Sequence, residues 1–273
     1  MTAPRLFGIP AADAAVVAVL RRGPTGWCSV GLWDLAAMEY RQGSWLRGTL
    51  YPQRCDVSPD GRWLAYFCLK PSAGWPAGPT YLAVSRLPWL TALVAWGTGG
   101  TWTSGLHFTP DLADWPGEPD VGDPRPLRER YGLAVTRAAS FAVERRRGWT
   151  ETSDTPPRSE DDVWDQQRQV AVEKASPADG SRRLVARGWY AAWRSFSPER
   201  YADAAYALDE GCGQRALDGV QWADWAPDGR LLVATTAGEL QVRDPDGGGV
   251  AWRTDLAGRE PESTSPPPEA SRW

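Results

Sequence analysis

The chain has 273 residues, 42% of them hydrophobic, which is enough to bury the core of one large β domain. Its net charge is −4, so general binding to nucleic-acid phosphates, which needs a basic excess, is not expected. The 28 Gly and 24 Pro indicate many turns between short elements, and the 17 Trp make the chain rich in tryptophan.

The first residues carry no pattern of a targeting or membrane segment. Residues 1–7 lack the basic stretch followed by an apolar stretch that a signal peptide requires. The longest apolar run, residues 14–20, is too short to span a bilayer. We therefore expect a cytoplasmic protein that has no membrane partner.

Three strands are predicted before residue 50, separated by turns rich in Gly and polar residues. They cover residues 14–22, 27–35 and 39–47. The first is almost wholly apolar and is expected to be buried, whereas the third carries many polar side chains and is expected to be a solvated outer strand.

The next stretch, Cys55–Tyr66, is predicted to be a β-hairpin. Val57 and Leu64 supply apolar positions on its two strands, and Pro59-Asp60-Gly61 reverses the chain. A second copy of this pattern occupies residues 223–233. Two such hairpins in one chain predict a repeated β-meander, which is the unit of a β-propeller.

Strands at residues 80–85 and 90–96 complete a four-stranded unit of roughly 45 residues, the usual length of a propeller repeat. Irregular segments rich in Pro, Gly, Thr or Asp interrupt the strands in this part of the chain. They are the predicted loops Pro71–Pro79, Gly97–Ser104 and Trp115–Pro126.

Residues 197–210 allow two interpretations. Ser197 suits a helix N-cap, Pro198 suits the first helical position, and Gly211 suits a helix stop, with several Ala between them. The alternative is a strand, because residues 195–199 resemble the start of the repeated hairpin. We predict a short helical insertion.

The last meander is predicted at residues 222–254, with a Pro-Asp-Gly turn between its first two strands. From residue 259 to residue 273 the sequence is dominated by Pro, Ser and Glu. A segment with so few apolar side chains is expected to be disordered. The predicted organisation is therefore a propeller over residues 1–258 and a disordered tail over residues 259–273.

The hairpin phrases Val57–Ala65 and Trp225–Val233 resemble the repeat of TolB-like and WD-type β-propellers, and Trp33-Asp34 resembles a WD strand end. The resemblance implies an all-β propeller fold, and counting the predicted meanders along the chain gives about five four-stranded blades, with six as the alternative. Such propellers are mostly interaction platforms, although enzymes occur on related architectures. The chain lacks the Gly-His pair of regular WD repeats.

Candidate catalytic and metal-binding residues are few. His107 is the only imidazole, and it lies on a predicted strand without the turn that presents a nucleophile, so a structural role is expected. A single His excludes a metal site built on several His ligands. The four Cys (Cys28, Cys55, Cys68 and Cys212) show no metal-ligand spacing and are predicted to be unpaired, buried thiols. No catalytic residue, metal or cofactor is predicted.

Asp56 and Asp224 occupy equivalent positions just before the two hairpin phrases. If they faced a common channel, they could act as the paired carboxylates of a glycoside hydrolase or another hydrolase. The simpler interpretation is that each one bonds the backbone of the adjacent turn, as Asp commonly does.

Trp75, Trp102 and Trp115 lie in the predicted loops, where a large aromatic side chain has less reason to be. They are the candidates for contact with a partner, although capping of the core beneath the loops is an alternative role. The favoured function is thus a non-enzymatic scaffold that binds another protein through loops on one face. The alternative is a hydrolytic propeller that uses Asp56 and Asp224.

Overall fold

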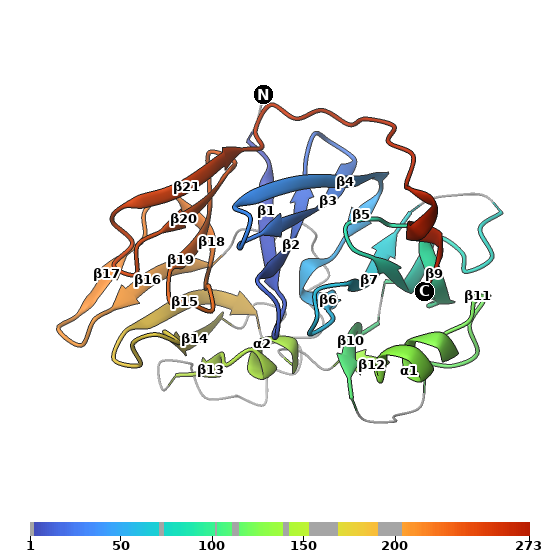
Figure 1. Ribbon diagram of the computed structural model, residues 1–273, viewed down its shortest axis with the longest axis horizontal. Helices are drawn as coiled ribbons and strands as arrows, with labels where there is room; N and C mark the ends of the chain where they lie inside the picture. The colour runs from blue at the N-terminus through green and yellow to red at the C-terminus, as the bar shows by residue number, and fades with distance from the viewer. Residues whose placement is uncertain are drawn as a thin grey trace. The chain divides into compact units, whose positions relative to one another are not determined.

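A computed structural model describes residues 3–70, 74–101, 103–110, 115–138, 142–152, 169–190 and 204–273. These residues form five β-sheets and a few short helices (Figure 1). The chain divides into two compact units. Unit 1 comprises residues 1–8 and 140–259, and unit 2 comprises residues 9–139 and 260–273.

The first sheet is a meander in which the strands are neighbours in chain order. Its strands are β1 (Arg5–Pro10), β2 (Val16–Arg22), β3 (Trp27–Asp34) and β4 (Glu39–Arg47). The side chains of β2 and β3 are buried almost throughout, while those of β4 are mostly half-buried or exposed. This is the arrangement that the apolar and polar patterns of these strands predict.

Two further sheets follow along the chain, within unit 2. One is ordered β11-β9-β8-β7-β5, with β6 also paired to β7, and a separate pair joins β10 to β12. The elements are β5 (Thr49–Leu50), η1 (Pro52–Arg54), β6 (Asp56–Val57), β7 (Trp63–Leu69), β8 (Thr80–Arg86), β9 (Ala92–Gly97), β10 (Gly105–Thr109), β11 (Val121–Gly122), α1 (Arg125–Tyr131) and β12 (Ala134–Ala138).

Unit 1 holds a five-stranded sheet and a four-stranded sheet, each a meander in chain order. The elements are α2 (Ala142–Arg146), β13 (Thr150–Glu151), β14 (Gln169–Ala175), β15 (Arg183–Tyr190), β16 (Ala205–Asp209), β17 (Gln214–Ala216), β18 (Val220–Trp225), β19 (Leu231–Thr235), β20 (Glu239–Arg243) and β21 (Val250–Asp255). Every strand pairing in these two sheets is antiparallel.

Both predicted hairpins are present, and their turns have the same form. Gly61 has φ +73° and donates its N–H to the carbonyl of Ser58 at 2.9 Å, and Gly229 has φ +82° and donates to Ala226 at 2.9 Å. Since a positive φ strains any residue with a Cβ, glycine suits this turn position. The recurring local sequence therefore builds the same unit twice.

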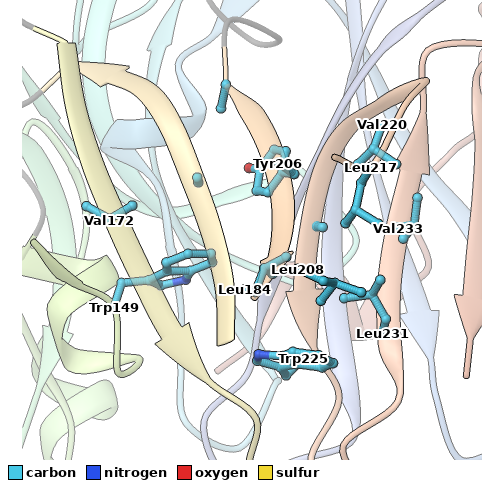
Figure 2. Close-up of a cluster of buried hydrophobic side chains, with 13 residues drawn as sticks. Trp149, Val172, Leu184, Tyr206, Leu208, Leu217, Val220, Trp225, Leu231 and Val233 are labelled. Carbon is cyan, nitrogen blue, oxygen red and sulfur yellow. The ribbon is translucent and has the colours of Figure 1, made fainter. Parts of the chain in front are cut away.

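The core of unit 1 lies between its two sheets (Figure 2). Leu184 and Leu208 from the five-stranded sheet, and Leu231 and Val233 from the four-stranded sheet, are all fully buried there. Trp225 also belongs to this cluster. The alternation of these residues along their strands places them on the inner faces, so sheet packs on sheet as in neighbouring propeller blades.

Two predictions are corrected by the structure. Residues 205–209 form strand β16 and pair with β15, with Ala207 opposite Val185, rather than continuing a helix. Burial of Tyr206 and Leu208 against the core outweighs the local helix preference of the Ala residues. The earlier part of the predicted helix, residues 197–203, lies outside the described residues.

The segment predicted to be disordered is the second correction. Residues 260–273 belong to unit 2, residues Pro268–Ser271 form a 3-10 helix (η4), and Ala270 is fully buried. Composition alone is misleading here, because Ala270 is fully buried and Trp273 packs on Trp63 of unit 2.

Candidate partner-binding loops

The first predicted loop joins β7 to β8 and is described from Gly74 onward. Its turn is closed by a hydrogen bond from the N–H of Gly78 to the carbonyl of Trp75 at 2.9 Å, and Gly74 and Gly78 both have positive φ. The Trp75 side chain is half-buried, with its ring centroid 5.9 Å from that of Tyr81 on β8. The glycine-rich sequence thus holds a large aromatic ring against the start of a strand.

The indole of Trp75 is not fully satisfied in this position. Its Nε1 is shielded from solvent and has no hydrogen-bond partner among the described residues. Burying an N–H without an acceptor costs about 1–3 kcal/mol.

Trp115, in the third predicted loop, has a different environment. It packs as a partly buried side chain on the core cluster of unit 2, and the guanidinium of Arg128 lies 4.5 Å from its ring centroid. This stacking on α1 is what the core-capping alternative predicts. The same segment is less irregular than predicted, since Val121–Gly122 forms β11 and pairs with β9.

The structure therefore does not gather the three predicted tryptophans into one described cluster. Trp75 contacts Tyr81, whereas Trp115 contacts Arg128, and Trp102 lies outside the described residues. The second loop is anchored by the buried side chain of Arg54, whose guanidinium donates to the carbonyl of Thr101 at 2.9 Å. Of the described candidates, Trp75 is the one held in a loop rather than packed on the core cluster.

The carboxylate of Asp56 is completely buried within unit 2. It accepts hydrogen bonds from the backbone N–H groups of Val57, at 2.8 Å, and of Phe108 on β10, at 2.8 Å. Asp56 thus ties the first strand of one hairpin to the following strand pair, which is a structural task.

Asp224 lies in unit 1 and is also buried. It accepts the N–H of Trp225 at 2.7 Å and forms an ion pair with Lys174 on β14, with 2.6 Å between Nζ and Oδ1. Trp225 in turn donates its indole N–H to the carbonyl of Lys174 at 3.0 Å. The two carboxylates considered for catalysis are therefore both engaged in bonds that join neighbouring strands.

Three of the four thiols are buried and unpaired, as predicted, while Cys212 is exposed. Burial raises the pKa of Cys55 from its ordinary value of 9.0 to about 12 and that of Cys68 to about 11. Burial also raises the pKa of Cys28. These three groups are neutral thiols at physiological pH, so they are poor nucleophiles.

A thiol assay should separate the two classes. In the native protein we expect Ellman's reagent to label Cys212 quickly and the other three only after denaturation. Because the folded-state pKa values of Cys55 and Cys68 are raised above 9.0, the stability that these thiols contribute is complete below pH about 9 and is lost as the pH rises toward 11–12. Rapid labelling of more than one thiol at pH 7 would contradict this arrangement.

Within the described ranges, no group of three or more His, Cys, Asp or Glu side chains is placed to hold a metal ion. Over the same ranges, no helix has the length and apolar character needed to cross a membrane. His107 lies on β10 opposite Thr136, a position within a strand pair.

The four-stranded antiparallel meanders and their repeated turns define the chain as an all-β, propeller-type repeat protein. No protein-family model and no curated protein matches its sequence.

Solved structures similar to the chain include propellers. The β-propeller domain of the Trilobed protease from Pyrococcus furiosus is 13% identical, with a TM-score of 0.30, over 92% of this chain and 84% of that one. The Swd1 β-propeller domain from Myceliophteria thermophila is 12% identical, with a TM-score of 0.28, over 94% and 90%. Dihydro-heme d1 dehydrogenase NirN is 13% identical, with a TM-score of 0.29, and this chain spans only 57% of its length.

Proposed function

We propose that this chain is a non-enzymatic scaffold of the TolB-like or WD type that binds another protein through the loop carrying Trp75. The observation that carries the proposal is the state of Trp75, half-buried in a Gly-rich loop with an unsatisfied indole N–H. Tryptophan is strongly enriched among residues that dominate protein interfaces, because it combines a large apolar surface with one donor.

The charge and the carboxylates support a protein as the partner. A net charge of −4 does not favour nucleic acid or an anionic membrane surface. The alternative, a hydrolase that uses Asp56 and Asp224, has less support. Asp56 accepts hydrogen bonds from backbone amides, and Asp224 forms an ion pair with Lys174. The cytoplasmic location that the sequence suggests is retained as part of the proposal.

A matched pair of variants tests this function. We expect Trp75→Ala to lower recovery of a co-purifying protein from native lysate at least tenfold, because truncation of a central interface tryptophan costs 2 kcal/mol or more, roughly a 30-fold change in affinity. Trp89→Ala is the control, since Trp89 is also half-buried but lies in the turn between β8 and β9. Equal recovery with both variants would contradict the proposal.

A further inference from the structure

Residues 260–273, here called the Pro-rich segment, pack on unit 2 through a small number of contacts. Ala270 is fully buried, η4 lies against β8, and the ring centroid of Trp273 lies 5.3 Å from that of Trp63. Two backbone hydrogen bonds shape the turn, from Ala270 to Pro267 at 2.9 Å and from Arg272 to Glu269 at 3.2 Å.

Trp273 packs on Trp63, and Trp63 is itself contacted by side chains from two other elements of unit 2. Trp63 on β7 is 0% exposed, and Tyr131 at the end of α1 meets it edge-on at a centroid distance of 5.0 Å. Arg86 lies opposite Trp63 in the β7–β8 register, with its guanidinium 5.0 Å from the indole centroid. Trp63, Arg86 and Tyr131 together form what we call the anchor site.

The pattern of burial along the Pro-rich segment has a period of three. Pro267, Ala270 and Trp273 are buried or half-buried, whereas all the residues between them are exposed. A 3-10 helix places residues i and i+3 on the same face, and polyproline also repeats every three residues. One face of the segment therefore contacts unit 2, and the other presents Glu, Ser and Arg to solvent.

The composition of the segment is that of a peptide ligand rather than of a domain element. It contains too few apolar side chains to fold alone, and its three consecutive prolines reduce the entropy lost on docking. Recognition of Pro-rich peptides by aromatic surfaces uses this combination of a preformed backbone and periodic anchors.

We infer that the anchor site is a peptide-binding site for a Pro-rich sequence of spacing Pro-x-x-Ala-x-x-Trp, and that residues 260–273 fill it as an intramolecular ligand. A partner protein that presents the same spacing displaces the segment. This site is separate from the Trp75 loop, so it goes beyond the function proposed above.

Because the Pro-rich segment is tethered to the anchor site, it competes strongly with any free peptide for that site. A segment that belongs to the same chain as its site competes at an effective concentration that is of the order of 1 mM for a short flexible linker. For a free peptide with an intrinsic Kd of about 10–100 μM, this competitor weakens the apparent affinity roughly 10- to 100-fold. Loosening the tethered segment should therefore reveal binding in trans.

The experiment uses the full chain and a labelled synthetic peptide with the sequence of residues 259–273, followed by fluorescence anisotropy. We expect Ala270→Arg and Trp273→Ala chains to bind the peptide at least tenfold more tightly than the wild-type chain. In the first variant a charged side chain cannot occupy the fully buried Ala270 position. Ser271→Ala, at an exposed position of the same helix, is the control and should behave as wild type.

A second measurement covers the case in which the peptide binds weakly. Hydrogen exchange on the full chain should show protection at the amides of Ala270 and Arg272, and that protection should be lost in Trp273→Ala. The inference is overturned if protection is absent in the wild type, if the peptide binds none of the variants, or if a peptide lacking the Trp binds them as tightly as the complete peptide does.

Two further outcomes separate this site from its alternatives. A wild-type chain that is a dimer, and that becomes a monomer in Trp273→Ala, would overturn the intramolecular assignment in favour of exchange between two copies. Trp75→Ala should leave peptide binding unchanged. The pull-down of a partner therefore tests the Trp75 loop, and the peptide-binding assay tests the anchor site, so one can fail without the other.

Discussion

Replacing Asp56 by alanine is expected to lower the free energy of unfolding by about 2–6 kcal/mol, because two buried backbone N–H groups lose their acceptor at about 1–3 kcal/mol each. The groups belong to Val57 and Phe108, and the carboxylate between them is 0% exposed. Urea denaturation followed by circular dichroism measures the change. Asp56→Asn keeps one side-chain oxygen and should lose less.

The control for this experiment is Asp13→Ala. Asp13 is exposed, and we expect its removal to change the free energy of unfolding by no more than about 0.5 kcal/mol. If Asp56→Ala proved as mild as Asp13→Ala, the structural role of Asp56 would be wrong and a functional role for its carboxylate would have to be reconsidered.

Truncating Trp63 to alanine should lower the free energy of unfolding by about 3–5 kcal/mol, the usual range for a fully buried aromatic side chain. The indole fills the core of unit 2 and carries contacts from Tyr131, Arg86 and Trp273. Trp63→Phe retains part of the volume and should cost less. Denaturant midpoints give the comparison, with Trp89→Ala as the half-buried control.

The same variant links stability to the Pro-rich segment. Loss of the Trp63 ring removes the partner of Trp273, so hydrogen exchange at Ala270 should accelerate in Trp63→Ala even where the rest of unit 2 remains protected. Unchanged exchange at Ala270 would show that Trp63 does not anchor the segment.

The repeated hairpins could be predicted from sequence because their signal is local. Pro-Asp-Gly sets the turn, the flanking apolar residues set the strands, and the structure has both at residues 57–65 and 223–233. The described residues form five sheets, the number of blades expected from counting the predicted meanders, although only two of these sheets have four strands.

The errors arise where a distant contact decides the structure. Residues 205–209 have helix-forming residues, but their pairing with β15 and the burial of Tyr206 make them a strand. The Pro-rich segment looks disordered by composition, but its order depends on Trp63, about 200 residues earlier in the chain. Only the three-residue spacing of Pro267, Ala270 and Trp273 could have signalled it.

The candidate site was predicted only in part for a similar reason. Their positions in predicted loops made Trp75 and Trp115 equal candidates for partner binding. In the structure, however, Trp115 stacks with Arg128 and packs on the core cluster of unit 2. Likewise, a bond from Asp56 to the adjacent backbone was expected, whereas its second partner, Phe108, has no local signal in the sequence.

Site-specific photocrosslinking in the native cell tests whether the chain binds a protein through the Trp75 loop. A photoreactive phenylalanine analogue at position 75 should yield one dominant crosslinked protein by mass spectrometry, and the same probe at position 89 should not. Identical crosslinks from both positions, or none from position 75, would contradict the account.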